Sequence, residues 1–180
     1  MTTSLYDMSV ASYLQVVGGF ASVLQKAEDH FKENSMDTGA VMQTRLREDM
    51  LPFQFQVISV MHHSLGAIKG IQEGVFTPPP SMPDLDFAGS QALVADTISQ
   101  LQSLDREAVD GLAGKAVTFK LSSMEIPFVA ENFVLSFSLP NLYFHATTAY
   151  DILRIAGVQI GKMDYLGKMR AGGPAAGTVT

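Results

Sequence analysis

Residues 131–157 read ENFVLSFSLPNLYFHATTAYDILRIAG, and this apolar stretch decides the fold class of the chain. It carries no formal charge between Asn132 and Tyr150, so a helix formed here must be buried on most of its circumference. Asn141 and His145 stand four residues apart within it and therefore share one helix face. A polar pair inside a buried helix marks the place where we expect the function of the protein.

Helical periodicity extends from this stretch over most of the chain. From Tyr6 to Phe31, apolar residues recur at alternating steps of four and three, the pattern of a helix seam. Gly18 and Gly19 within this segment indicate a tight packing contact or a slight bend. Asp37 is suited to cap a short helical segment that follows. The long predicted helices cover residues 4–33, 52–72, 87–104 and 130–156.

Two segments interrupt the helical pattern. The proline-rich residues 78–83 cannot be helical, and we expect them to form a long crossover. Residues 117–121 and 124–128 alternate in polarity, which predicts a small β-hairpin with Pro127 on an edge strand. The predicted fold is therefore all-α, an up-down four-helix bundle with a long crossover and a small hairpin before the last helix.

Length and composition indicate one domain and a partner subunit. We assign residues 1–170 to a single domain and expect the Gly/Ala/Pro-rich residues 171–180 to form a disordered tail. Charged residues make up only 17% of the chain, which favours a homodimer that covers part of the surface. The net charge of -6, without a cluster of basic residues, argues against nucleic-acid binding.

Cysteine usage and targeting signals narrow the class of protein further. The chain has no cysteine, which excludes disulfides, a thiolate nucleophile and cysteine-ligated metals. No basic segment followed by an apolar one opens the sequence, so we expect a cytoplasmic protein. The uncharged run in residues 132–150 is long enough to span a membrane, but its polar side chains favour a buried bundle helix instead.

His145 is the candidate catalytic residue, as a general acid, a general base or a metal ligand. Its candidate partners are His62, Asn141 and Tyr150, and Pro140 predicts a kink beside it. His62 and His63 are adjacent and lie about 100° apart on a helix, so only one can face the core, and the apolar pattern favours His62. The alternative is a buried histidine bonded to a backbone carbonyl or a hydroxyl from another helix.

Three sequence blocks carry a resemblance to a known group of proteins. These blocks are PNLYFHATTAYDILR, GKMDYLG and TRLREDMLPFQFQV. The chain resembles, from about Leu5 to Gly167, a bacterial and fungal family of unknown function that is grouped with the DinB-like helical bundles. The resemblance implies a DinB-like four-helix bundle that is commonly dimeric.

The resemblance also implies a metal site that this chain does not complete. In the wider DinB-like group, one histidine on the second helix and an HxxxH pair on the fourth hold a divalent metal such as nickel or zinc. His145 matches the first member of that pair, whereas Ala149 stands at the second position. His62 or His63 matches the ligand on the second helix. Two of three ligands argue against a metal cofactor and against the thiol-transferase activity of some DinB-like proteins.

The sequence thus predicts a small-molecule pocket protein with cofactor-independent acid/base catalysis of the isomerase, cyclase or dehydratase type, centred on His145. One alternative is a non-catalytic binding protein or structural dimer. A second is a residual metal-dependent DinB-like transferase that uses His62, His63 and His145. Phosphate-binding and hydrolase motifs, such as GxGxxG and GxSxG, do not occur.

Overall fold

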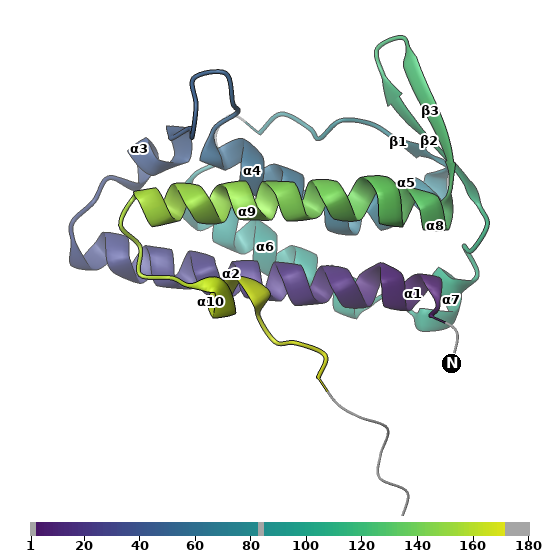
Figure 1. Cartoon of the computed structure of the whole chain (residues 1–180), viewed down its shortest axis with the longest axis horizontal. Coiled ribbons are helices and arrows are strands. Elements are labelled where there is room, and N and C mark those ends of the chain that lie inside the picture. Colours follow the sequence, from purple (N-terminus) through teal and green to yellow (C-terminus); the bar gives the residue numbers. More distant parts are fainter. Residues whose placement is uncertain (1–2, 83–84, 172–180) are drawn as a thin grey trace, which may run out of the picture.

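Four helical columns lie side by side in the computed structural model, and a three-stranded sheet stands at one end (Figure 1). The structure describes residues 3–82 and 85–171, so the tail expected to be disordered lies, from residue 172, outside the described residues. The columns confirm the four helices that periodicity predicts. They consist of α1 (Leu5–Met8) with α2 (Val10–Glu33); α4 (Phe53–Met61), η1 (His62–Gly66) and α5 (Ala67–Glu73); α6 (Phe87–Gln102); and α8 (Ala130–Phe133), η2 (Val134–Ser138) and α9 (Leu139–Ile155).

Local sequence signals set the ends of these helices. The Ser4 hydroxyl accepts from the Asp7 amide at the start of α1, and Asp37 and Asp86 cap α3 (Thr38–Gln43) and α6 in the same way. Gly74 ends α5 with a φ of 80°, a left-handed conformation that glycine adopts without strain. At Ser9 the backbone leaves the helical region, with φ -99° and ψ -85°, and this break separates α1 from α2.

The long crossover determines the direction of the third column. After β1 (Val75–Phe76) the chain runs back along the bundle, so α6 points the same way as α4 and α5 (Figure 1). The four columns therefore run up, down, down and up. Within this arrangement α4 packs on α9 and α6 packs on α2.

The sheet contains one strand that the sequence pattern does not predict. The expected hairpin is present as β2 (Ala116–Leu121) and β3 (Met124–Val129), with Ala116 opposite Val129. The short β1 pairs parallel with β2 on the other side and leaves β3, which carries Pro127, as an edge strand. At the base of the sheet the ring of Phe119 lies 4.8 Å from that of Phe137, which holds the hairpin against the helices.

Two π-helical segments, η1 and η2, face each other inside the bundle. The Ser138 hydroxyl of η2 donates to the His63 carbonyl of η1 at 2.7 Å, and the buried Tyr13 hydroxyl lies 2.7 Å from the same Ser138 oxygen. Since Ser138 donates its proton to His63, Tyr13 is the donor to Ser138. The irregularity expected near Pro140 thus takes the form of the π-helical turn η2, which ends just before that proline.

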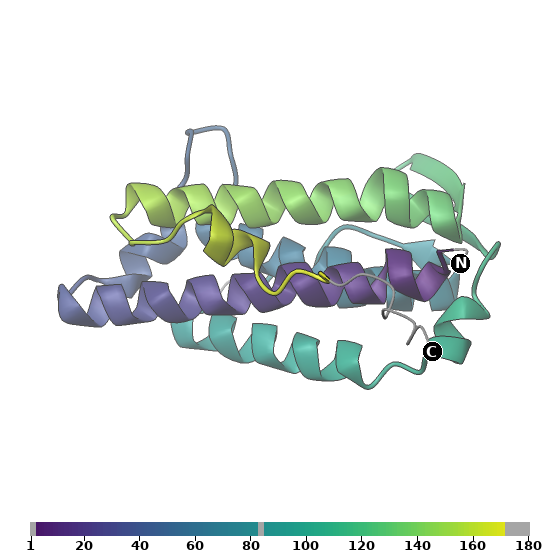
Figure 2. The same ribbon diagram turned by 60° about the horizontal axis from the view of Figure 1, so that its bottom comes forward.

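A short helix after the bundle, α10 (Lys162–Leu166), crosses α2 at Gly19 (Figure 2). A Cβ atom at Gly19 would lie 2.7 Å from the Tyr165 carbonyl oxygen, whereas one at Gly18 would meet nothing within 4 Å. The tight contact indicated by the glycine pair therefore exists at one of its two members. α7 (Arg106–Asp110) is a further short helix that the sequence pattern does not predict.

The core fills the space between the columns with aliphatic and aromatic side chains. Its largest fully buried members come from all four columns and include Tyr13, Phe53, Leu101 and Phe133. No helix in residues 3–82 or 85–171 combines the length and the apolar character that crossing a bilayer requires.

Candidate functional site

The candidate site lies where α4, η1 and α9 meet, and His145 of α9 is its centre. The Nδ1 atom of His145 lies 2.7 Å from the Oε1 atom of Gln56, which α4 contributes. Gln56 is buried, with an exposed fraction of 2%. Its amide nitrogen donates in turn to the Leu51 carbonyl at 2.8 Å. This chain of hydrogen bonds ties the imidazole to the beginning of α4.

The partners of Gln56 determine the tautomer of His145. The Leu51 carbonyl can only accept, so the amide group of Gln56 must face it and the amide oxygen must face His145. An oxygen acceptor requires that Nδ1 of His145 carries the proton. The Nε2 atom is therefore left with a lone pair, and it accepts hydrogen bonds or protons.

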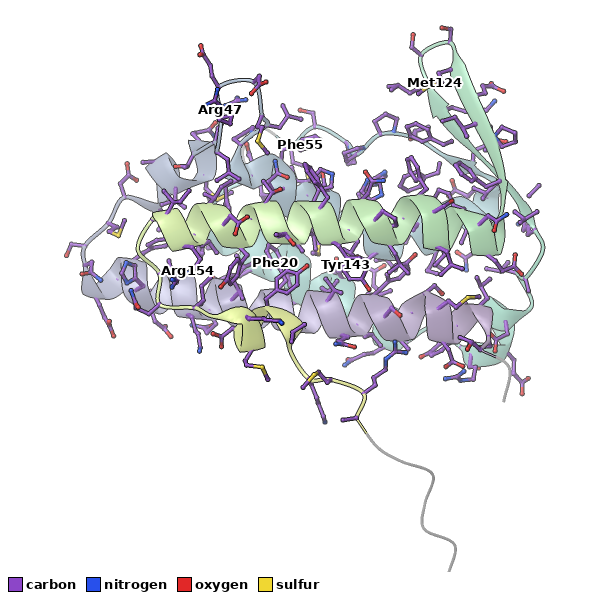
Figure 3. All side chains as sticks on the ribbon, viewed as in Figure 1. Phe20, Arg47, Phe55, Met124, Tyr143 and Arg154 are labelled. Atoms are coloured by element: carbon purple, nitrogen blue, oxygen red, sulfur yellow. The ribbon has the colours of Figure 1, made fainter. Side chains whose placement is uncertain are left out.

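Three aromatic rings surround the His145 imidazole. The His63 ring is nearly parallel to it, with centroids 5.7 Å apart and an interplanar angle of 14°. Phe55 and Phe144 approach edge-on, at 5.9 and 5.1 Å. In Figure 3, Phe55 lies on the side of α9 toward α4, and Tyr143 lies on the opposite side in that view. The His145 side chain is thus surrounded by aromatic rings but remains partly exposed to solvent.

The structure reverses the preference for His62 as the histidine that faces the core. His63 is buried, with an exposed fraction of 6%, while His62 is half-buried. The Nε2 atom of His62 donates to the Thr77 carbonyl at 2.7 Å, and its ring stacks on Phe76. The helical face that His63 shares with Gln56, Val60 and Ala67 is fully buried, whereas Phe55 and Gly66, on the face of His62, are half-buried.

Burial keeps all three histidines of this region neutral at pH 7. Desolvation lowers the pKa of His145 to about 4. Desolvation, with smaller contributions from His145 and His62, lowers the pKa of His63 to about 3. Desolvation also lowers the pKa of His62, although the bond to Thr77 opposes it. The Nδ1 atom of His63 is buried without a hydrogen-bond partner in the described chain.

Two of the residues predicted as partners of His145 are bonded elsewhere. The Asn141 side chain donates to the Phe137 carbonyl of its own helix at 2.7 Å. The Tyr150 ring packs against Tyr165, and its hydroxyl donates to the Ile160 carbonyl at 3.5 Å. Neither of these hydrogen bonds reaches the His145 imidazole, whose bonded partner is Gln56.

A cavity beside α4 has Phe55 in its wall. This cavity has a volume of about 250 Å³ and lies between Pro52, Phe55, Ile58 and the crossover residues Pro80 and Met82. Of four other surface cavities, one shares Ile58, Pro80 and Met82 with it and is also lined by His62. His145 lines none of these five. Phe55 thus lines this cavity, and its ring centroid also lies 5.9 Å from that of the His145 imidazole.

The donor set does not fit the three-ligand metal centre that the resemblance implies. Within residues 3–82 and 85–171, no three side chains of His, Cys, Asp or Glu type are placed to hold one ion. His62 is engaged with Thr77, and Ala149 is fully buried where the second ligand of the fourth helix would stand. His63 and His145 remain, and two imidazoles fall short of the usual protein ligand sets of zinc.

Gln56 and the two phenylalanines are the site residues that sequence reasoning missed. Gln56 belongs to the run LPFQFQV, where two glutamines interrupt an apolar segment. It also shares a helical face with His63, because the two are seven residues apart. A buried glutamine on the face of a histidine was the available signal.

Comparison with known proteins places the chain in a family and a fold. A domain of unknown function, DUF1993, matches residues 5–166. The chain is similar to the crystal structure of a DinB family member protein from Shewanella denitrificans, with a TM-score of 0.76 and 24% identity over 94% of this chain and 96% of that one. A search of curated proteins found no match.

These matches confirm the DinB-like helical bundle expected from the sequence blocks. The structural match rests on 24% identity, and it carries the fold alone. The family match covers nearly the whole described chain, including every residue of the His145 site. The chain belongs to the DUF1993 family.

Proposed function

We propose that the protein binds a small molecule at His145 and that Nε2 of this imidazole accepts a hydrogen bond from the ligand. The observation that carries the proposal is the hydrogen bond between His145 and Gln56. The Gln56 amide is bonded at both ends, so it holds the ring in one orientation. Here it holds the proton on Nδ1 and presents an unprotonated Nε2.

The surroundings of His145 indicate the kind of ligand. Phe55 and Phe144 offer ring edges and faces, and Phe144 is 55% exposed. Neighbouring His63 is neutral, so the rings around Nε2 supply no charge to balance an ionic ligand. An uncharged ring that carries an O–H or N–H group suits this environment, because it stacks on the aromatic residues and donates to Nε2.

Acid/base catalysis is the second part of the proposal. In an isomerisation, a cyclisation or a dehydration, the first step is the transfer of a ligand proton to Nε2 of His145. The imidazolium returns the proton in the second step. General bases work best with a pKa near the working pH. The pKa of about 4 makes His145 a weak base, so we rank binding before catalysis. A cytoplasmic location is part of the same proposal.

Ligand-observed NMR tests the proposal with phenol, indole and 2-pyridone as probes. We expect saturation transfer to the probes with the wild-type chain and its loss in His145→Phe, which keeps an aromatic ring but removes the acceptor. His30→Gln, which removes an imidazole at the far end of α2, should leave binding unchanged. Equal transfer with His145→Phe and wild type, or none with wild type, would contradict the proposal.

A non-catalytic homodimer is the second candidate function, and one observation favours it. Phe144 and Ile155 are 55% and 74% exposed on α9. They are eleven residues apart, which places them on nearly the same side of a helix. A second copy of the chain on this face would cover both side chains.

A further inference from the structure

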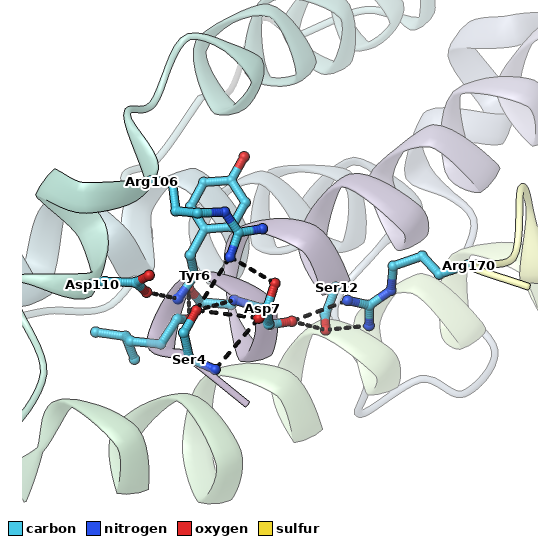
Figure 4. A network of polar contacts seen from close by, with 9 residues as sticks. Ser4, Tyr6, Asp7, Ser12, Arg106, Asp110 and Arg170 are labelled. Carbon is cyan, nitrogen blue, oxygen red and sulfur yellow. Dashed lines mark hydrogen bonds and ion pairs between the residues drawn. The ribbon is translucent and has the colours of Figure 1, made fainter. Parts of the chain in front are cut away.

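A second cavity shares no lining residue with the His145 site. It has a volume of about 490 Å³ and opens between the start of the first column and η2. Met8, Leu135 and Leu139 supply an apolar wall. Asp7, Ser12 and Arg170 supply the polar side (Figure 4). The cavity therefore combines apolar surface with a permanently charged guanidinium group.

The helix break at Ser9 holds Arg170 in place. In a helix, each carbonyl normally accepts a hydrogen bond from the amide four residues later. For the Asp7 carbonyl, the break at Ser9 lies between the two residues. The Asp7 carbonyl accepts instead from Nη1 of Arg170, at 3.1 Å, and from the Ser12 hydroxyl. Nη2 of Arg170 donates to the same Ser12 oxygen at 3.1 Å. The two hydrogen bonds that Arg170 donates therefore go to neutral acceptors.

Arg170 is exposed and forms no ion pair within the described residues, although a carboxylate lies close by. The Asp7 carboxylate forms an ion pair with Arg106 at 2.9 Å, and the Ser4 hydroxyl and amide donate to its other oxygen (Figure 4). The guanidinium of Arg106 also lies over the Tyr6 ring, 4.2 Å from its centroid. The hydrogen bond from Arg106 lowers the pKa of Asp7 most, and the bonds from Ser4 lower it further. Within the described residues no carboxylate is within ion-pair distance of Arg170.

We propose that this cavity binds the carboxylate of a small amphipathic acid. Arginine retains further N–H donors beyond the two used here, and its planar group matches a carboxylate with paired hydrogen bonds. The short chain of the acid lies against Met8, Leu135 and Leu139, which excludes water from it. Binding needs both the charge and the apolar chain of the ligand. An alcohol of the same length lacks the charge, and inorganic phosphate lacks the apolar chain.

Chemical-shift mapping with hexanoate tests this site on the full chain. We expect saturable shifts of the Arg170 Nε–H signal and of the Leu135 and Leu139 methyl groups. Hexanol and inorganic phosphate, at equal concentration, should leave these signals in place or bind at least about tenfold more weakly, since each lacks a charged hydrogen bond or the apolar contact. Hexanol binding as tightly as hexanoate would overturn the proposal, and so would a wild-type chain that does not respond.

Matched variants separate this role of Arg170 from a general charge effect. Arg170→Gln should weaken hexanoate binding about tenfold, because it removes the charged donor. Lys168→Gln removes an equal charge two residues away and should leave affinity unchanged. Arg106→Gln keeps Arg170 but frees the Asp7 carboxylate, and it should also weaken binding. Equal losses in Arg170→Gln and Lys168→Gln would reduce the effect to net charge and overturn the site.

Discussion

At the scale of single residues, the orientation of His145 depends on Gln56. Free imidazole at neutral pH exchanges its proton between two nitrogens, and the nitrogen that finds an acceptor keeps it. Because the Gln56 oxygen is the acceptor at Nδ1, the reactive lone pair is assigned to Nε2. The amide thus acts on the chemistry of the site without lying at its surface.

Gln56→Leu should change the tautomer of His145. The substitution replaces the amide acceptor by an apolar side chain of similar size, so no hydrogen bond then favours the proton on Nδ1. Long-range ¹H–¹⁵N correlation spectra should show Nδ1 protonated in the wild type and a shift toward Nε2 protonation in the variant. The exposed Gln25→Leu serves as control. A tautomer that is the same in all three proteins would disprove the assignment.

At the scale of elements, the pair of π-helical segments depends on a small set of hydroxyl contacts. Ser138→Ala should lower the free energy of unfolding by about 2–3 kcal/mol, because it leaves the buried Tyr13 hydroxyl and the His63 carbonyl without their partner. Burial also raises the pKa of Tyr13, so its hydroxyl remains a proton donor. Urea unfolding measures the effect.

A double-mutant cycle isolates the contact between Tyr13 and Ser138. Tyr13→Phe alone removes the donor, and the combined variant leaves no hydroxyl unpaired between the two residues. The combined loss should therefore fall short of the sum of the single losses by about 1 kcal/mol. Additive losses would mean that the two hydroxyl groups do not interact in solution.

The adjacent glycines of α2 should respond in opposite directions to the same substitution. Gly18→Ala should raise the free energy of unfolding by about 0.5–1 kcal/mol, since alanine favours the helix and its Cβ meets nothing within 4 Å. Gly19→Ala should lower it by about 1–3 kcal/mol, because the new methyl group displaces the backbone of α10. Urea unfolding of the two variants is the measurement, and stabilisation by both would contradict the close approach at Gly19.

The sequence predicts the long elements well because their signals are local. Periodicity suffices for the four long helices, the capping residue Asp37 for α3, and alternation for the hairpin. The π-helical turns and β1 are not predicted because contacts with distant segments define them, and α7 is not predicted because it is only five residues long. β1, for instance, is two residues long and exists only through its pairing with β2.

The candidate site likewise has one part that local sequence predicts and one part that only tertiary packing creates. His145 stands out in the sequence because it is polar in an uncharged helix. Its partner Gln56 lies 89 positions away and only tertiary packing brings it close. His63 replaces His62 as the core histidine because the face that it shares with Gln56 and Val60 is the one that packs into the bundle. For a site made by two helices, the sequence therefore indicates His145 but not its partner from the other helix.

At the scale of the whole molecule, the buried histidines should make stability depend on pH. His145 and His63 have folded-state pKa values of about 4 and about 3, below the ordinary value of 6.5. As pH falls below about 6.5, the unfolded chain takes up protons first, so stability is complete above that pH and declines toward pH 4. His145 alone accounts for a loss of about 3 kcal/mol over this window.

Urea unfolding at several pH values between 4 and 7 checks this dependence. His145→Phe should flatten the decline below pH 6.5, whereas His30→Gln should follow the wild-type curve. Carboxylates contribute equally to all three curves at lower pH, and the comparison removes their effect. Parallel curves for wild type and His145→Phe would show that His145 titrates normally in the folded state.

The proposed homodimer predicts a mass of two chains in solution. Light scattering should report this mass for the wild type, and Ile155→Asp should shift the protein to single chains because a charge on this face cannot be buried without a partner. Leu121→Asp changes an exposed leucine on the hairpin and serves as control. Single chains in the wild type would exclude the dimer.

The backbone contact between Gly19 and α10 also bears on how the chain folds as it is synthesised. Asp164, Tyr165 and Gly167 lie against the middle of α2, which leaves the ribosome long before them. Until α10 emerges, this face of the nascent helix has no cover, and contacts between such distant positions form late. Synthesis should therefore expose this surface to chaperones for most of the translation time.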